Sequence, residues 1–277
     1  MKDSRVSVIV TTRNNASTLD ACLRSIVDQS YENIELLVID NNSRDNTKDI
    51  AKNYTKLVFD KGPERSTQRN FGVHKAKGSY ILIIDSDMEL TKNVVADCVK
   101  QTAIHPEAKA LIIPEESFGE GFWAQCKRLE RSFYIGQDDI EAARFFEKSL
   151  YEQVGGYDET MVGGEDWDLS QRMREYTTIG RVSALIMHNE GRFSLHTALK
   201  KKFYYTKGFM TYYDKHKTTS SAPSASALKY YKLYLSRPGK LFQNPVYGFG
   251  VLFMKTCEFG AAALGYFGTK INAREEA

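Results

Sequence analysis

Short apolar runs alternate with helix-compatible stretches through the first third of this 277-residue chain, and this alternation constrains its fold more than any other feature. Residues 5–12 (RVSVIVTT), 34–40 (IELLVID) and 79–85 (SYILIID) are rich in Val and Ile without helical spacing, which predicts buried strands. Residues 17–27 instead repeat apolar side chains every three or four positions, which predicts a helix. The alternation predicts an α/β fold with an open, mostly parallel sheet flanked by helices on both faces.

Polar residues follow three of the predicted strands. Thr11, Asp40 and Asp85 each stand at a strand end. Ligands of open α/β sheets bind beyond the carboxyl ends of the strands, so we expect one crevice to hold all three side chains. Further strands are expected at 56–59, 108–114, 142–148 and 182–188, and further helices at 43–54, 64–76, 118–136, 165–176 and 194–217.

The acidic pair in SYILIIDSD is the most specific local signal. Asp85 and Asp87 follow a buried strand with one small residue between them, and such carboxylates repel each other unless a cation joins them. Oxygen ligands suit Mg²⁺ or Mn²⁺, which take one or two carboxylates and complete their coordination with phosphate oxygens and water. A nucleotide diphosphate would supply those phosphates. The alternative is that one of the acids only caps a helix near Thr91.

Positive charge gathers toward the C-terminus. The net charge is +3, yet residues 196–277 carry 13 Lys or Arg against four Asp or Glu. Within them, the apolar segment 244–268 contains Lys255 and Glu258, which can pair on one helix face. We expect a helix or helical hairpin there, either lying on a membrane surface or packed as an ordinary helix. The basic, aromatic C-terminal part, which includes the helix expected at 194–217, favours contact with anionic lipid headgroups or with a lipid-diphosphate acceptor. The alternative is a basic face that only contacts solvent.

The cysteines and the N-terminal run bear on the cellular compartment. Cys22, Cys98, Cys126 and Cys257 form no CxxC pair, which predicts neither a zinc site nor a disulfide framework. The apolar run at 6–10 is too short for a signal-peptide core. We therefore expect a cytoplasmic protein, at the inner face of the cell membrane.

Three segments in order resemble glycosyltransferase family 2 enzymes with the GT-A fold. Residues 6–47 are similar to the opening strand-helix-strand unit of that family, residues 66–87 to its central segment, and residues 149–173 to the segment with its catalytic acid. The resemblance covers roughly residues 4–215 and implies a Rossmann-like sheet and a nucleotide-sugar-dependent transferase. No Gln-x-x-Arg-Trp motif occurs, which favours transfer of a single sugar over processive synthesis.

The resemblance also implies which residues bind the donor nucleotide. They would be Thr11, Asp40, Arg69, Asn70 and Asp85, with Arg65 as a neighbour. The loops TTRNN and DNNS depart from the family's common Pro-Thr-Tyr-Asn and Asp-Asp-Gly-Ser types. Both loops touch the base-binding region, so the donor nucleotide is left open.

The metal and the general base follow from the same resemblance. Asp87 would ligate Mg²⁺ or Mn²⁺, with Asp85 and His188 as further ligands. The alternatives are that Asp85 contacts the ribose or a metal-bound water and that His188 has a structural role. Asp166 in GGEDWDL would be the general base, and Glu165 is the alternative. A base on the sugar face opposite the leaving diphosphate gives inversion in one displacement. The same segment also fits a plain helix start, because acids in a first turn complement the helix dipole.

The predicted organisation is a catalytic domain at 1–217, a linker at 218–227, and a helical, membrane-associating extension at 228–277. The predicted function is metal-dependent, inverting transfer of one sugar from a nucleotide-diphosphate sugar to a hydroxyl of a lipid-linked or cell-surface glycan precursor. The expected partners are the donor, that acceptor and a membrane surface, with no nucleic acid.

Other function classes fit the sequence less well. A sugar-phosphate nucleotidyltransferase would need a glycine-rich phosphate loop, and TTRNNAST has no glycine. A nucleic-acid binder fits less well, because an acidic crevice would repel the phosphates of a nucleic acid unless a metal ion lay between them. The main alternative is a non-catalytic, membrane-associated binding protein on the same scaffold, which would be expected to lack the metal ligand or the base.

Overall fold

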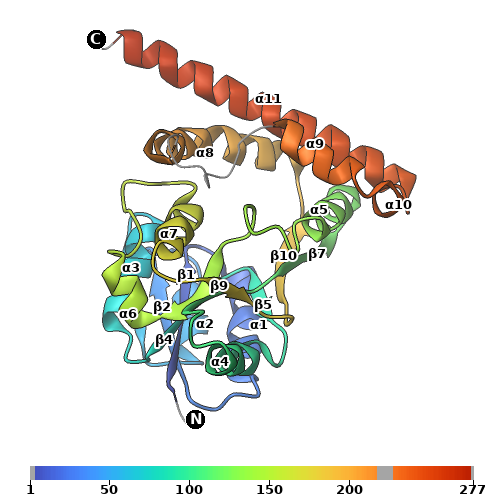
Figure 1. Ribbon diagram of the computed structural model, residues 1–277. Helices are drawn as coiled ribbons and strands as arrows, with labels where there is room; N and C mark the ends of the chain where they lie inside the picture. The colour runs from blue at the N-terminus through green and yellow to red at the C-terminus, as the bar shows by residue number, and fades with distance from the viewer. Residues whose placement is uncertain (1–3, 217–226, 276–277) are drawn as a thin grey trace. The chain divides into compact units, whose positions relative to one another are not determined.

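The computed structural model describes residues 4–216 and 227–275, which form two compact units (Figure 1). The first unit comprises the residues up to Glu116, Glu141–Glu159 and Glu165–Asn189; the second comprises Ser117–Ile140, Thr160–Gly164 and the residues from Glu190 onward. The division at 217 stays a prediction. The predicted linker, 218–227, lies outside the described residues except for Ala227.

A seven-stranded sheet forms the core of the first unit, in the order β3-β2-β1-β4-β8-β6-β9. Strands β1 to β4 are parallel, whereas β8 runs antiparallel to both β4 and β6. The predicted mostly parallel sheet is confirmed, and the antiparallel β8 makes it a mixed sheet. Its strands are β1 (Val6–Thr12), β2 (Ile34–Asp40), β3 (Val58–Asp60), β4 (Tyr80–Asp85), β6 (Ala110–Ile112), β8 (Ala143–Glu147) and β9 (Ile179–Arg181).

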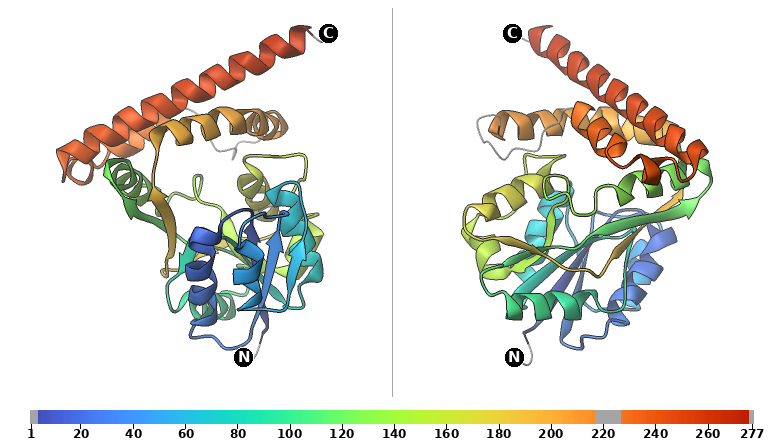
Figure 2. Two further views of the ribbon diagram at one scale, coloured as in Figure 1. Left: turned by 180° about the vertical axis from the view of Figure 1, so that it is seen from behind. Right: turned by 45° about the vertical axis from the view of Figure 1, so that its right-hand side comes forward.

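Helices cover both faces of this sheet (Figure 2). Alternate residues of one strand serve opposite faces, so Val8 and Ile9 of β1 enter two different cores. Burial on both faces explains why the strands read as continuous apolar runs. The Val8 face holds α1 (Ala16–Val27), α2 (Thr47–Lys52) and α4 (Val94–Ile104); the Ile9 face holds α3 (Arg65–Lys75), α6 (Lys148–Gln153) and α7 (Glu165–Arg174).

A second, three-stranded sheet has the order β5-β10-β7, formed by Met88–Leu90, Ile186–Arg192 and Glu115–Glu120. The acidic pair of Asp85 and Asp87 therefore leads into a strand. Helix α4 begins only at Val94, with Asn93 at its N-cap. The alternative that one of the acids caps this helix is wrong.

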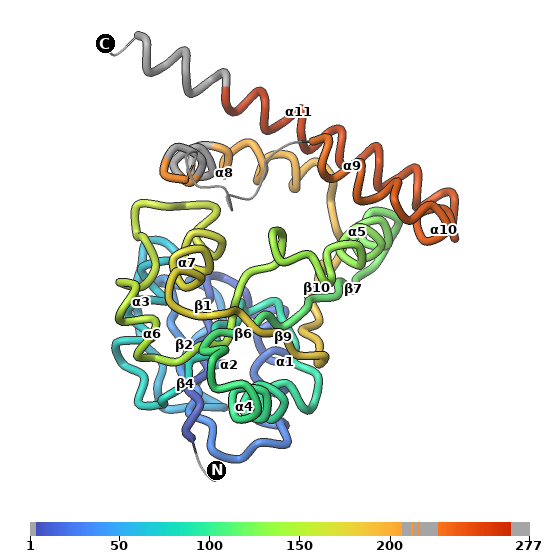
Figure 3. The backbone as a smooth tube through the Cα atoms, in the orientation of Figure 1, coloured from blue at the N-terminus to red at the C-terminus, as the bar shows by residue number. Residues whose placement is uncertain are grey.

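The second unit is helical beside its strand segments. It contains α5 (Phe122–Ser132), α8 (Leu195–His216), α9 (Ala227–Leu235), α10 (Pro238–Leu241) and α11 (Pro245–Glu275), whose backbones are traced in Figure 3. Helix α11 packs against α5 and α8. It is one continuous helix, so the alternative of a helical hairpin at 244–268 is wrong. Within the described ranges, no helix combines the length and apolar character needed to cross a membrane.

Four charged side chains lie together in the second unit, and we call them the ion cluster: the half-buried Lys127 and the buried Glu130, Lys255 and Glu258. Lys255 Nζ lies 2.5 Å from Glu130 Oε1 and 2.8 Å from Glu258 Oε2. Lys127 Nζ lies 2.9 Å from Glu130 Oε2. The three-residue spacing of Lys255 and Glu258 thus predicted their pairing correctly, and Glu130 of α5 completes the cluster.

Candidate functional site

The carboxyl ends of three adjacent strands carry the predicted polar residues. In the strand register, Thr11 is opposite Asp85 and Thr12 is opposite Asp40. Thr11 Oγ1 donates a hydrogen bond to Asp85 Oδ1 at 3.2 Å. Asp40 is fully buried and accepts hydrogen bonds from the Ser43 backbone N–H and hydroxyl. The three predicted residues therefore share one edge of the sheet, although only Thr11 and Asp85 are in contact.

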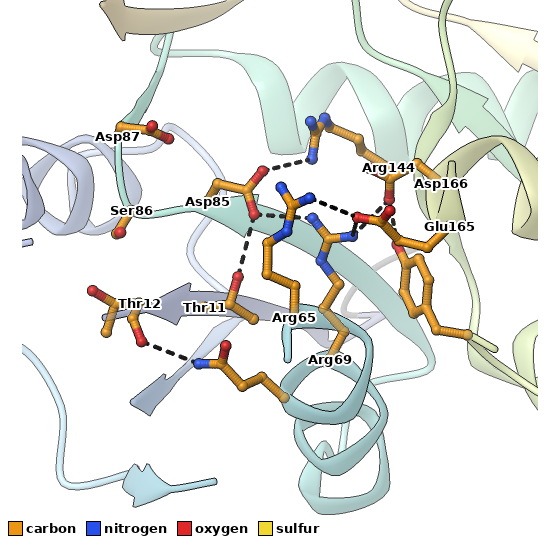
Figure 4. A network of polar contacts seen from close by, with 12 residues as sticks. Thr11, Thr12, Arg65, Arg69, Asp85, Ser86, Asp87, Arg144, Glu165 and Asp166 are labelled. Atoms are coloured by element: carbon orange, nitrogen blue, oxygen red, sulfur yellow. Dashed lines mark hydrogen bonds and ion pairs between the residues drawn. The ribbon is translucent and has the colours of Figure 1, made fainter. Parts of the chain in front are cut away.

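Arg69 of α3 joins the strand ends to the start of α7 (Figure 4). Its side chain is fully buried, with Nη2 at 3.0 Å from Asp85 Oδ1 and Nη1 at 2.8 Å from Asp166 Oδ1. Nη1 also lies 3.3 Å from Glu165 Oε1. One guanidinium thus fixes both predicted acidic segments, 16 and about 100 residues away in sequence, in a single site.

Arg144 of β8 is a third guanidinium at this site, beside Arg65 and Arg69. Its Nε donates to Glu115 Oε1 at 2.6 Å, and its Nη1 lies 3.7 Å from Asp85 Oδ2 (Figure 4). Nη1 is buried without a hydrogen-bond partner. A buried donor left in this state is costly, so Arg144 has a hydrogen bond to offer to a ligand oxygen.

The arginines keep Asp85 ionised. Burial alone would raise the pKa of this carboxyl, but Arg69, Arg144 and Arg65 outweigh burial and hold its pKa well below its usual range. Its Oδ1 accepts from Thr11 and Arg69, while Oδ2 faces Arg144. Asp85 is therefore an anion already surrounded by protein cations.

The two candidate bases differ in accessibility. Helix α7 begins at Glu165, as a plain helix start also predicts. The Glu165 side chain is 5 % exposed and lies near Arg69 and Arg65, whereas the Asp166 side chain is 26 % exposed and accepts a hydrogen bond from Tyr157 at 3.1 Å. Burial, followed by the Asp166 charge, raises the pKa of Glu165. An acceptor hydroxyl can reach Asp166 more easily.

The residue before this helix, Gly164, has a backbone conformation that favours glycine. Gly164 has a φ of +81°, a conformation that L side chains rarely adopt. A Cβ there would lie 3.1 Å from Tyr212 of α8. The missing side chain at Gly164 therefore leaves room for Tyr212 of this chain.

Two of the three predicted metal ligands lie together. The antiparallel pairing of β5 with β10 places His188 Nε2 at 3.3 Å from Asp87 Oδ2, and the Asp87 side chain is 41 % exposed. His188 Nδ1 lies 3.7 Å from Glu115 Oε2. Among the described residues, no group of three His, Cys, Asp or Glu could hold a metal ion. Asp87 and His188 are thus a partial set, and the role of Asp85 as a direct ligand stays a prediction.

The charge balance of these residues fits a divalent cation. We call the following residues the site network: Arg65, Arg69, Asp85, Asp87, Glu115, Arg144, Glu165, Asp166 and His188. As far as the structure describes this site, three arginines stand against five carboxylates, a surplus of two negative charges with His188 neutral. A carboxylate and phosphate oxygens suit Mg²⁺ or Mn²⁺.

The Asn70 side chain forms hydrogen bonds with Tyr151, Tyr157 and Glu159 of the first unit. Its Nδ2 donates to Tyr157 O and Glu159 Oε1, and its Oδ1 accepts from the Tyr157 backbone N–H and the Tyr151 hydroxyl. These contacts occupy all four hydrogen bonds available to an amide. Donor binding by Asn70 stays a prediction, and its observed contacts tie α3 to the segment before α7.

Three members of the site escaped the sequence analysis: Glu115, Arg144 and Tyr157. Arg144 reaches Asp85 only because β8 lies antiparallel beside β4, which no local pattern indicates. Glu115 begins a strand that periodicity did not reveal. Tyr157 lies in VGGYDE, a segment already matched to the family, where an aromatic beside two glycines was the available signal.

Known proteins with similar sequences support one family. The family model described as Glycosyl transferase family 2 matches residues 7–151, just over half of the chain. A Campylobacter jejuni GalNAc(5)-diNAcBac-PP-undecaprenol beta-1,3-glucosyltransferase is 28 % identical over 181 residues, 58 % of this chain and 57 % of that protein. Glycosyltransferase GlyA of Streptococcus pneumoniae is 26 % identical over 158 residues, 55 % of this chain and 21 % of that protein. The chain thus matches less than two thirds of the length of these relatives.

Solved structures support the same fold. The mannosyltransferase PcManGT from Pyrobaculum calidifontis, in complex with GDP-Man and Mn²⁺, gives a TM-score of 0.63 at 18 % identity, covering 94 % of this chain and 86 % of that one. S. aureus TarS 1-349 in complex with UDP gives 0.53 at 14 % identity, covering 99 % and 92 %. At these identities the likeness concerns the fold alone, and it confirms the predicted GT-A architecture. By the match of the family model, the chain belongs to glycosyl transferase family 2.

Proposed function

We propose that this protein transfers a single sugar, with inversion, from a nucleotide-diphosphate sugar to a hydroxyl acceptor. The observation that carries the proposal is the meeting of two acidic segments on one buried guanidinium, with Asp85 and Asp166 both bound to Arg69. A helix start or a helix cap needs no such convergence. Sugar transfer does, because a departing diphosphate and a deprotonating hydroxyl lie on opposite faces of one sugar.

The donor would be held by the strand ends and the arginines. Thr11 and Asp40 are the proposed contacts for the nucleobase and ribose, and the spare Nη1 of Arg144 would donate to an oxygen of the sugar or the diphosphate. Arg65 and Arg144 would stabilise the negative charge that grows on the diphosphate.

Asp87 and His188 would hold Mg²⁺ or Mn²⁺ together with diphosphate oxygens. When bound, the ion would supply further stabilisation of the leaving group's charge. The surplus of two carboxylates in the site network supports this assignment, as does the exposure of Asp87. The similar mannosyltransferase structure contains Mn²⁺ with its donor.

Asp166 is the proposed general base. It would accept the proton of the acceptor hydroxyl while Arg69 and Tyr157 hold its carboxylate in place. Glu165 is better suited to fixing Arg65 and Arg69, because its side chain is nearly buried between them.

The acceptor is proposed to be a lipid-linked or cell-surface glycan precursor, reached from the cytoplasmic side of the cell membrane. The name of the Campylobacter jejuni relative includes a polyprenol diphosphate, which supports a lipid-linked acceptor. A non-catalytic binding protein on this scaffold is less favoured, because both the metal ligand Asp87 and the base Asp166 are present.

The test is release of nucleoside diphosphate from a panel of UDP-, GDP-, CDP- and dTDP-sugars, in Mg²⁺ or Mn²⁺ and in EDTA. We expect release from at least one donor with metal, and none in EDTA. Metal-dependent binding of a sugar nucleotide without turnover, in the presence of polyprenyl diphosphate-linked acceptors, would support the binding-protein alternative instead.

A further inference from the structure

Helix α11 turns four of its large apolar side chains outward, whereas Val251 and Met254 are buried. Val246, Phe249, Phe253 and Leu264 are 65 %, 65 %, 57 % and 68 % exposed. They are separated by three, four and eleven positions, a spacing that places them on one side of a helix. We call these four residues the outer face of α11. It extends over about 27 Å at 1.5 Å per residue.

Aromatic side chains of neighbouring segments continue this face. The Phe253 ring stacks on Trp123 of α5, with the ring centroids 6.1 Å apart. The ring centroids of Phe249 and Phe242 are 5.4 Å apart. Phe122, next to Trp123, is itself 40 % exposed. The apolar surface is therefore wider than one helix stripe.

Two charged side chains of the same helix point the opposite way. Lys255 and Glu258 are 6 % and 7 % exposed and belong to the ion cluster. Lys255 also lies within 6 Å of the ring centres of Tyr134, Tyr230 and Phe259. A helix that covers a water-soluble core does the reverse, with its charges outward and its apolar side chains inward. Helix α11 departs from that pattern at these positions, while Val251 and Met254 still pack inward in the hydrophobic cluster of the second unit.

The surrounding helices are basic. Lys200, Lys201, Lys202, Lys232 and Arg237 are exposed on α8, on α9 and just before α10. Among the described side chains of α8 to α11, the one acid is the buried Glu258. Two copies of this surface would repel each other, whereas an anionic surface would attract it.

We infer that the outer face of α11 docks on an anionic phospholipid bilayer. The exposed Phe and Leu side chains would enter the headgroup region, and the exposed bases would contact lipid phosphates. Lys255 and Glu258 would stay in the protein interior, so the two charges of the apolar segment would not enter the lipid. The docking goes beyond sugar transfer and needs no donor, so each can be tested without the other.

The test is sedimentation of the full chain with phosphatidylcholine vesicles that contain or lack phosphatidylglycerol, without nucleotide. Phe249→Ser with Phe253→Ser removes the centre of the outer face. Val27→Ser with Ile104→Ser is the matched control, since these side chains of the first unit are 52 % and 57 % exposed. Circular dichroism verifies that both variants are folded, and release of nucleoside diphosphate from soluble donor is measured in parallel.

We expect the original chain and the control to sediment with anionic vesicles, less so as salt is added. The outer-face variant should lose about tenfold or more of its partitioning and keep its turnover with soluble donor. Equal partitioning of the outer-face variant, or no binding of the original chain, would overturn the inference. So would light scattering that finds a dimer in the original chain and a monomer in the outer-face variant, because the face would then belong to self-association.

Discussion

The two buried groups of charges in this molecule differ in balance. The ion cluster of the second unit pairs two lysines with two glutamates, and Tyr134 adds a hydrogen bond to Glu130. The site network of the first unit carries surplus carboxylates and two buried guanidinium nitrogens without hydrogen-bond partners, Nε of Arg69 and Nη1 of Arg144. Both groups are costly to bury, yet only the ion cluster is complete without a ligand.

The pKa shifts of the glutamates follow the same division. Burial alone would raise the pKa of Glu130, but Lys127 and Lys255 hold it far below its usual value. In the site network, burial and the neighbouring Asp166 raise the pKa of Glu165 despite its two arginines. We therefore expect the balanced ion cluster to serve stability and the unbalanced site network to bind a cation and an anionic substrate.

The largest effect is expected at the proposed base. Asp166→Asn removes the proton acceptor and keeps the shape of the side chain, so kcat should fall about 10²–10⁴-fold. Donor affinity, measured by calorimetry, should stay within about threefold, because Asp166 itself is not among the proposed donor contacts. Glu165→Gln should lower kcat less. A larger loss in Glu165→Gln than in Asp166→Asn would transfer the role of base to Glu165.

The next effect is on stability. Glu130→Gln leaves Lys127 and Lys255 with an incomplete partner in a buried place, which should cost about 3–5 kcal/mol of unfolding free energy. Glu120→Gln is the control, since Glu120 is 77 % exposed and its pair with Arg192 is at the surface. The control should change stability by less than about 0.5 kcal/mol. Urea unfolding measures both, and equal stability of the two variants would remove the structural role of the ion cluster.

The smallest effect is expected at Arg144. Arg144→Lys keeps the charge but loses the planar fork that contacts Glu115 and faces Asp85, so kcat/KM for the donor should fall about 10- to 100-fold. Arg24→Lys, at a 65 % exposed side chain of α1, is the control and should leave kcat/KM unchanged. An unaltered kcat/KM in Arg144→Lys would mean that the spare Nη1 does not meet the donor.

Sequence predicted the parallel half of the sheet well and the other half less completely. Strands β1, β2 and β4 are apolar on both faces, so their composition is enough to identify them. Strands of three residues, such as β5 and β9, contain too few positions for a period. Residues 118–136 were expected as one helix, whereas β7 ends at Glu120 and α5 begins at Phe122.

The site residues were likewise predictable only where a local sequence pattern marks them. Asp85, Asp87 and Asp166 could be predicted, because they belong to short motifs beside recognisable elements. Arg144 and Glu115 could not, because antiparallel pairing and ion pairing between distant segments bring them to Asp85. The burial of two charges of α11 was equally hidden, because their partners on α5 lie far back in the chain. Lys255 pairs with Glu130, about 125 residues earlier, and Glu258 lies 3.8 Å from Lys127.

The claim that unbalanced acids await a divalent cation and a diphosphate can be measured directly. Calorimetry of UDP, GDP, CDP and dTDP binding, with Mn²⁺ or with EDTA, is compared between the original chain and Asp87→Asn. We predict that at least one nucleotide binds only with Mn²⁺, and that Asp87→Asn weakens this binding by about tenfold or more. Binding equally tight in EDTA, or unchanged in Asp87→Asn, would contradict the claim.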